Sequence, residues 1–382
     1  MGENENPELD DWDETAIDEE GEPCDPEMVE PFDPTEINIV PKQDTLRNLI
    51  ERLRNDEIDM NTDFQRHADL WSPSQMSRLI ESILIRFPLP AFYFDASDDN
   101  KWLVVDGLQR LSSIRKFVVN GKEGSSKPLR LCGLEYLKAL NGSIYNALSR
   151  QYQRRIDECP ITLYLIQPGT PDNVKYSVFR RINTGGLVLN NQEIRNALAK
   201  PRERKFLQEL AEDENLVRTM GDQSKRMVDQ ELVLRFISFY IQDYLKSPKN
   251  IAVFMDEAMD AIKSYSDSDQ RRLSRVFKKS TNLSFQIFGE MAFEKRDATE
   301  PQRRKRKNTS LFEVWTVCLA KLSEMDAEKL INGKEQVVNK LNMLLENDNE
   351  FLNSVSFATQ KRDHVRIRYD RVGKIIQEIT NA

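Results

Sequence analysis

The first 36 residues of the chain contain 16 acidic side chains and not one Lys or Arg. Such a proline-dotted segment, poor in aliphatic side chains, cannot bury enough apolar surface to fold, so we expect disorder over residues 1–36. Of the 63 acids in the chain, 47 remain beyond this leader against 55 bases, so the rest of the chain carries +8 although the whole carries −8. This asymmetry is typical of nucleic-acid-binding proteins, but a solvated tail beside an ordinary surface gives it too.

Composition excludes several classes of protein. No stretch approaches the ~20 apolar residues of a membrane span, and the N-terminal residues are acidic rather than basic and then apolar as in a signal peptide, so we expect a cytoplasmic protein without a membrane partner. The four cysteines form no CxxC pair, which favours reduced thiols. Only two histidines are present, His67 and His364, which argues against a zinc site built on paired histidines and against an HNH nuclease. Any metal would be a hard cation on carboxylate and phosphate oxygens.

Apolar spacing predicts an α+β protein, with a small mixed β-sheet head followed by a mostly helical second half. We expect an acidic leader at residues 1–36, the sheet-containing domain at 37–200 and a helical domain at 201–382. Ser72 and Pro73 form a helix start signal, with Ser72 as N-cap. The predicted strands are residues 37–40, 91–94, 102–105 and 161–166, and the predicted helices are 45–54, 74–86, 108–119, 172–182, 192–198, 229–245, 251–265 and 311–322.

One corner between a strand and a helix carries more polar groups than a turn needs. The apolar run 102–105 ends in Asp106 and Gly107, and a helix follows at once with Gln109 and Arg110. A helix N-terminus reached through a glycine is an anion site, Arg110 can clamp phosphate oxygens, and Gln109 can orient a water or a phosphate. An acid beside phosphate holds Mg²⁺ or positions a nucleophilic water, which we predict for Asp106. The structural alternative makes Asp106 the N-cap and puts Arg110 in a surface ion pair.

A second charged feature lies between two predicted helices of the second half. Five consecutive cations cannot be neutralised by their own neighbours, so we predict that they contact the DNA backbone. The alternative is an exposed linker that happens to be basic. The residues are Arg303, Arg304, Lys305, Arg306 and Lys307.

Four sequence blocks carry a resemblance to a known family. Asp106 to Arg110, read DGLQR, resembles the DGQQR motif of the ParB/sulfiredoxin-like domain at the N-terminus of GmrSD-type type IV restriction enzymes. Residues 63–72, 79–90 and 179–196 are similar to three further blocks of that family in the same order. This chain has Leu108 where the motif has its first glutamine.

The resemblance implies a head that binds and hydrolyses a nucleoside triphosphate, GTP or ATP, with Mg²⁺, in prokaryotic defence against foreign or modified DNA. The implied catalytic residues are Asp106, which would also hold the metal, and Gln109. We add Glu81 as a third catalytic candidate that would contribute to a metal site; the alternative for Glu81 is a solvated polar position. The implied nucleotide-binding residues are Gln65, Arg66, Gly107, Arg110, Arg181 and Asn183.

The family's HNH half has no counterpart here, since the second half offers a single histidine. We therefore expect DNA and a separate nuclease or other defence protein as partners. A homo-oligomer is possible too, and the oligomeric state stays open. Two alternatives remain at this point. One is a non-catalytic, nucleotide-gated DNA-binding regulator, and the other is a phosphodiesterase that acts directly through Asp106 and Glu81.

Overall fold

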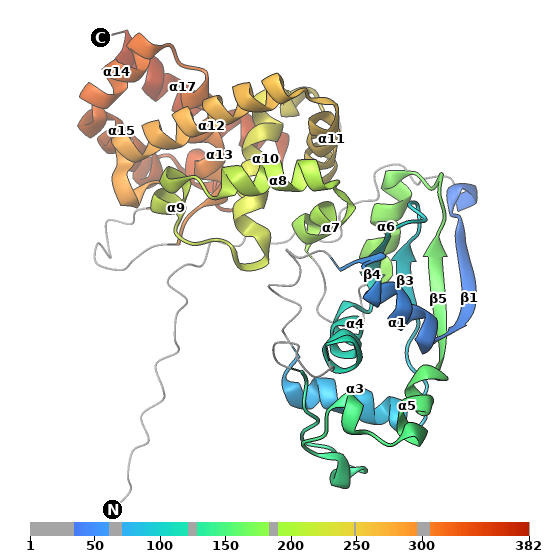
Figure 1. Ribbon diagram of the computed structural model, residues 1–382. Helices are drawn as coiled ribbons and strands as arrows, with labels where there is room; N and C mark the ends of the chain where they lie inside the picture. The colour runs from blue at the N-terminus through green and yellow to red at the C-terminus, as the bar shows by residue number, and fades with distance from the viewer. Residues whose placement is uncertain are drawn as a thin grey trace, which may run out of the picture. The chain divides into compact units, whose positions relative to one another are not determined.

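The computed structural model describes residues 34–60, 71–120, 128–182, 190–247, 250–295 and 306–381 (Figure 1). Contacts divide the chain into two compact units, which meet in the sequence between Leu198 and Ala199. Most of the acidic leader lies outside the described residues; its last three, Pro34–Glu36, form a 3₁₀ turn.

The first unit is built on a mixed five-stranded sheet, which confirms the predicted α+β class. The order across the sheet is β1 (Ile39–Thr45), β5 (Pro160–Ile166), β3 (Phe92–Asp95), β4 (Trp102–Asp106) and β2 (Ile58–Asp59) (Figure 1). β1 pairs with β5 and β3 with β4 in antiparallel fashion, whereas β3–β5 and β2–β4 are parallel. Three strands lie within one residue of their predicted bounds. β1 begins two residues later than predicted and is longer, and β2 was not predicted.

Helices cover one face of this sheet with a continuous apolar core. This core is formed by the buried sides of three helices, α1 (Leu46–Arg54), α3 (Pro73–Leu84) and α4 (Leu108–Ile114). They pack on Phe92 and Phe94 of β3. The predicted start of α3 is confirmed, because Ser72 accepts from the Gln75 amide in a capping box and Pro73 is the first helical residue. The predicted helix 108–119 keeps α-geometry only to Ile114 and continues as a π-turn, Arg115–Val119. A further short helix, α5 (Arg150–Asp157), was not predicted.

Two later helices of this unit are α6 (Asp172–Ile182) and α7 (Asn191–Leu198), which pack on each other. α6 also packs against β4. A buried ion pair fastens α6 to the end of β3, with Lys175 Nζ 2.8 Å from Asp95 Oδ2. This pair marks the end of the sheet opposite to the corner at Asp106, because β3 and β4 run antiparallel.

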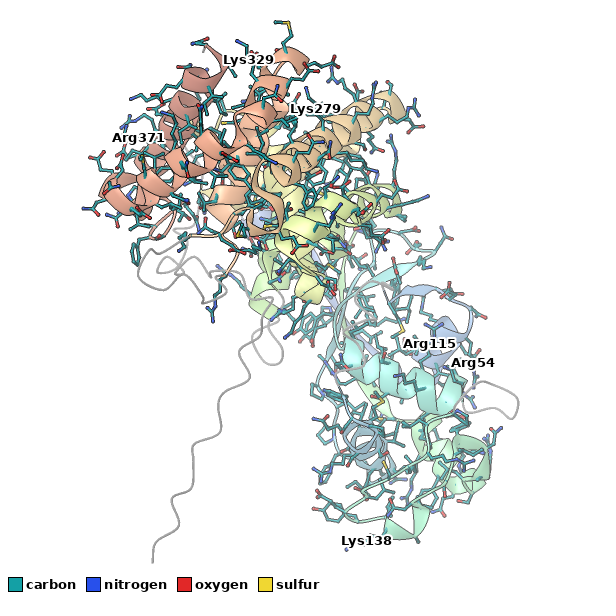
Figure 2. All side chains as sticks on the ribbon, turned by 90° about the vertical axis from the view of Figure 1, so that its left-hand side faces the viewer. Arg54, Arg115, Lys138, Lys279, Lys329 and Arg371 are labelled. Carbon is teal, nitrogen blue, oxygen red and sulfur yellow. The ribbon has the colours of Figure 1, made fainter. Side chains whose placement is uncertain are left out.

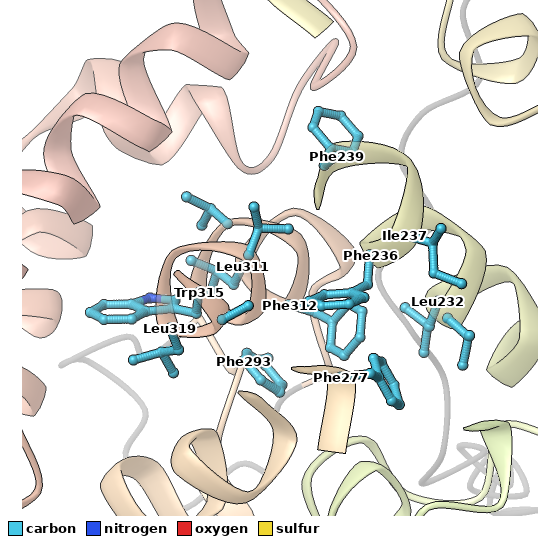
Figure 3. Close-up of a cluster of buried hydrophobic side chains, with 14 of the residues drawn as sticks. Leu232, Phe236, Ile237, Phe239, Phe277, Phe293, Leu311, Phe312, Trp315 and Leu319 are labelled. Atoms are coloured by element: carbon cyan, nitrogen blue, oxygen red, sulfur yellow. The ribbon is translucent and has the colours of Figure 1, made fainter. Parts of the chain in front are cut away.

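The second unit is a helical assembly around α10 (Val228–Ile241) and α13 (Thr309–Ala320). Both helices are apolar on nearly every side, as expected of helices in the centre of a fold. Phe236 of α10 packs edge to face on Phe277, with ring centroids 5.0 Å apart, and Phe312 and Trp315 of α13 belong to the same buried cluster (Figure 3). Around them lie α8 (Pro201–Ala211), α9 (Glu214–Met220), α11 (Ile251–Ser264), α12 (Asp267–Phe288), α14 (Glu324–Asn332), α15 (Lys334–Asn347), α16 (Asn349–Ser354) and α17 (Arg362–Thr380).

A buried charge network ties three of these helices together. Glu313 on α13 accepts from Arg235 Nε on α10 at 2.9 Å and from Arg368 Nη2 on α17 at 2.7 Å. Arg368 also donates to the carbonyls of Ser354 and Thr359. All three charged side chains are at most 5% exposed. The network fixes how α17 packs on the central pair, and removing one member would leave a buried charge uncompensated.

Within the described part of the chain, no helix combines the length and apolar character that crossing a membrane requires.

Candidate functional site

The corner after β4 depends on a glycine for steric reasons. Gly107 has a φ of 101°, in the region that side chains disfavour, and it is the N-cap position of α4. A Cβ at this position would lie 2.5 Å from Cδ1 of Phe92. Gly107 is therefore explained by backbone geometry and core packing, without a phosphate. The side chain of Asp106 makes no cap bond, so the predicted structural alternative of Asp106 as N-cap is wrong.

Arg110 is held by protein groups on three sides. Its Nη2 lies 2.7 Å from Asp106 Oδ2 and 3.1 Å from the carbonyl of Ala91, and its Nη1 donates to the carbonyl of Pro90. The guanidinium carbon lies 4.5 Å above the Phe92 ring, and the side chain is 11% exposed. Burial lowers the pKa of Arg110 and the charge of Asp106 opposes that effect. The guanidinium therefore connects the corner to the segment before β3 and holds the Asp106 carboxylate in one orientation.

Asp106 is the accessible group of the corner. Its side chain is 36% exposed. Arg110 binds Oδ2, and Oδ1 accepts no hydrogen bond within the described part of the chain. One carboxylate oxygen is thus fixed in place while the other can bind a cation or a water. Mg²⁺ in phosphoryl-transfer sites typically takes one or two carboxylates and completes its shell with phosphate oxygens and water.

Two stacked tyrosines lie next to Asp106 across the sheet, and the sequence analysis missed them. Tyr93 pairs in register with Asp106 on one side and with Tyr164 on the other. The two rings stack at 4.8 Å with an interplanar angle of 13°, and both side chains are half-buried. Burial raises the pKa of Tyr93, and the neighbouring Tyr164 and Asp106 add to that rise. The only sequence signal is the alternation of each tyrosine with buried apolar neighbours, which predicts a common face but not a common site.

Glu81 has a different role from either predicted one. It is 3% exposed on the buried side of α3, so it is not a solvated polar position. Its Oε1 accepts from the amides of Tyr136 at 2.8 Å and Leu137 at 2.7 Å, and its Oε2 accepts from the amide of Glu135 at 3.0 Å. Burial alone would raise the pKa of Glu81, but these bonds and the charge of Arg78 outweigh it and hold that pKa below its ordinary value. Glu81 anchors a loop, and this geometry explains it without catalysis.

The remaining predicted nucleotide-site residues are placed only in part. Gln109 is half-buried at the second position of α4, and Arg181 is exposed near the end of α6, the helix that packs on β4. Gln65, Arg66 and Asn183 lie outside the described residues. The structure therefore unites Asp106, Gly107, Gln109 and Arg110 on one corner, and the contribution of the other residues stays a prediction.

The basic run of the second unit requires a correction. Lys307 is 14% exposed, and its ammonium lies 2.9 Å from Glu294 Oε1 and donates to the carbonyls of Glu290 and Ala292. The premise that none of these cations is neutralised nearby is wrong for Lys307. Arg306 is exposed, and Arg303, Arg304 and Lys305 lie outside the described residues.

No group of three or more His, Cys, Asp and Glu side chains in the described ranges is arranged to hold a metal ion by itself. A metal at the corner would accordingly depend on Asp106 together with ligands from a bound substrate.

The first unit is an α+β domain in which strand β4 ends at Asp106 and Gly107 is the N-cap of helix α4. Residues 46–200 match the family model described as GmrSD restriction endonuclease, N-terminal domain. This match confirms the resemblance carried by the four sequence blocks, and it ends before α8, so the helices that follow are outside it. No curated protein and no solved structure matches the chain.

Proposed function

We propose that this chain binds a nucleoside triphosphate with Mg²⁺ at the Asp106 corner and hydrolyses it, as a component of a restriction-type defence system. The observation that carries the proposal is the Asp106 carboxylate, which Arg110 holds by one oxygen and leaves open at the other. The match of the surrounding segment to a restriction endonuclease domain supports the biological setting.

The chain's own residues divide the work at this corner. Asp106 positions the attacking water or a phosphate-bound cation, and Gln109 on the next helix orients the γ-phosphate. Arg110 acts as a positioning residue for Asp106, because its donors are already committed to protein oxygens. Mg²⁺, when bound, supplies neutralisation of charge on the phosphate oxygens. The resemblance to the family assigns the rest of the phosphate binding to Gln65, Arg66, Arg181 and Asn183.

The tyrosine stack supplies a place for the nucleobase. Asp106, Tyr93 and Tyr164 lie on successive strands, so the stack extends about 10 Å from the carboxylate across two strand spacings. This span is comparable to the separation of base and phosphates in a nucleotide. Aromatic rings bind every base by stacking, so the stack by itself sets no preference among the bases.

Two other functions were open from the sequence. A direct phosphodiesterase mechanism would need Glu81 as its second carboxylate. The structure argues against it, because the Glu81 carboxylate already accepts hydrogen bonds from three backbone amides. The non-hydrolysing, nucleotide-gated regulator of DNA binding uses the same corner, and turnover distinguishes it from the proposal.

The test is phosphate release from each of the four common NTPs with Mg²⁺, with and without DNA. Wild-type protein is expected to release phosphate. In Asp106→Asn the rate of release should be lower by a factor on the order of 100 or more. The matched control is Asp99→Asn, the same change on an exposed turn of the same sheet. Binding without release would favour the regulator. An Asp106→Asn protein as active as wild type would remove the assignment of the site.

A further inference from the structure

The longest helix of the second unit is rich in cations and carries no acid after its first turn. α12 has five cations within residues 271–279, and its two acids, Asp267 and Asp269, both lie in its first turn. Its buried side faces the core through Leu273, Phe277 and other residues. The exposed side forms what we call the α12 stripe. It consists of Arg271, Arg275, Lys278, Asn282 and Gln286.

The three cations of this stripe make no close side-chain contact with an acid. Among the residues that the structure describes, no ion pair or hydrogen bond is made by the side chains of Arg271, Arg275 and Lys278, whereas exposed Arg272 beside them interacts at longer range with Asp269. Lys279, labelled in Figure 2, is turned toward the protein and donates to the Leu322 carbonyl. Like charges three and four residues apart on a helix repel, each pair costing a few tenths of a kcal/mol.

On other helices of this unit, solvent-accessible cations form ion pairs with acids of the same helix. Lys205 on α8 lies 3.6 Å from Glu209, Arg218 on α9 lies 3.7 Å from Glu214, and Lys263 on α11 lies 2.7 Å from Asp260. Each of these pairs follows the three- or four-residue spacing that relieves repulsion on a solvated face. Residues 270–288 of α12 contain no acid at all, a pattern that a solvated face does not need and that favours a polyanionic ligand.

The side chains of the stripe favour duplex DNA over other polyanions. From Arg271 to Gln286 the stripe runs about 22 Å along the helix, at 1.5 Å per residue. Its cations and its two side-chain amides are the groups that contact phosphate and sugar oxygens of a duplex. Stacking platforms for unpaired bases are missing from the stripe, and nearby Phe285 is covered by Arg218, whose guanidinium carbon lies 3.8 Å above the ring.

We propose that the α12 stripe binds the phosphate backbone of duplex DNA without reading its sequence. This goes beyond the proposed nucleotide site, since the stripe belongs to the other compact unit and needs no hydrolysis. It also moves the predicted DNA contact of the second half from residues 303–307, where Lys307 is neutralised, to residues 271–286.

The experiment measures binding of the full chain to a duplex of arbitrary sequence by fluorescence anisotropy, between 50 and 200 mM salt. The variant combines Arg271→Gln, Arg275→Gln and Lys278→Gln. If the three cations contact phosphates, the slope of log K against log salt becomes shallower by about 0.9 for each, so by up to about 2.7. Affinity at low salt should fall at least tenfold.

The matched control removes the same charge from exposed cations that already have acidic partners. It combines Lys205→Gln, Lys340→Gln and Arg366→Gln, whose partners are Glu209, Glu378 and Asp363. Its salt slope should stay within a few tenths of wild type. Circular dichroism of both triple variants checks that they remain folded.

Three results would overturn the proposal: the same slope for the stripe variant and wild type, an equal loss in the matched control, or tighter binding of a single strand than of the duplex. Phosphate release in the absence of DNA separates this proposal from the nucleotide site. The stripe variant should keep that activity, and Asp106→Asn should keep DNA binding.

Discussion

Replacing Glu81 by Gln tests whether this carboxylate anchors a loop or takes part in chemistry. The amide oxygen of Gln can still accept from Tyr136 and Leu137, but its NH₂ group then faces the Glu135 amide, donor against donor. One charge-assisted bond is lost and two become neutral. With about 1.5–3 kcal/mol for a bond to a charged group and about 1 kcal/mol for a neutral one, the expected loss is about 4 kcal/mol of stability.

Hydrogen exchange read by mass spectrometry on peptides covering residues 131–142, with thermal denaturation, measures this loss. In Glu81→Gln the amides of residues 135–137 should exchange orders of magnitude faster than in wild type. The control is Glu135→Gln, whose exposed carboxylate has only a surface pair with Arg78, and it should change stability by less than about 1 kcal/mol. Unchanged exchange at residues 135–137 in Glu81→Gln would refute the anchor. A stable variant without phosphate release would restore the catalytic role.

The same anchor predicts a pH dependence. The pKa of Glu81 is lower in the folded protein than in the unfolded chain, so the unfolded chain takes up the proton first as the pH falls. The contribution of Glu81 is fully present above the unfolded pKa of about 4.3 and is lost as the pH falls through the lower folded value. Protection of the amides of residues 135–137, expressed relative to their intrinsic exchange rates at each pH, should therefore fall in wild type as the pH drops below about 4.3. In Glu81→Gln that loss of protection should be absent; if it persists, another group is responsible.

Three further substitutions test other parts of the structure. Gly107→Ala places a Cβ 2.5 Å from the Phe92 ring at a φ of 101°, so thermal denaturation should show about 1–3 kcal/mol of destabilisation, and an unaltered midpoint would contradict the described turn. Glu313→Gln leaves two buried arginines with a neutral partner and should cost about 3–5 kcal/mol in denaturant unfolding; a loss below 1 kcal/mol would mean that the network is relaxed by water. Tyr164→Leu keeps apolar cover but removes the ring, and calorimetry should show nucleotide affinity reduced by about 1–3 kcal/mol; equal affinity would exclude the tyrosine stack from the site.

Local signals made much of the fold predictable. The cap at Ser72 and Pro73, the apolar spacing of α1 and α3, and the strand–turn–helix around Gly107 are all short-range patterns, and the structure contains them. The corner residues could be named for the same reason, since Asp106 and Arg110 are four residues apart on consecutive elements.

Long-range contacts account for what was missed. The amides that Glu81 binds lie more than fifty residues further along the chain, and helical spacing says nothing of them. Tyr93 and Tyr164 meet because β3 and β5 are parallel neighbours, which the order of strands in the sequence does not reveal. Lys307 looked free because Glu294 is brought to it by a short antiparallel bridge. Exposure of the basic α12 residues likewise depends on which side of that helix the core covers.

The central claim is that the chain binds a nucleoside triphosphate at the Asp106 corner, and calorimetric titration with a non-hydrolysable NTP and Mg²⁺ tests it most directly. Wild-type protein should give saturable binding with one site per chain. Asp99→Asn should match wild type, and Asp106→Asn, which changes the proposed metal ligand, should lose the Mg²⁺-dependent part of the affinity. No saturable binding of any of the four nucleotides, or binding that Asp106→Asn leaves unchanged at every Mg²⁺ concentration, would contradict the account.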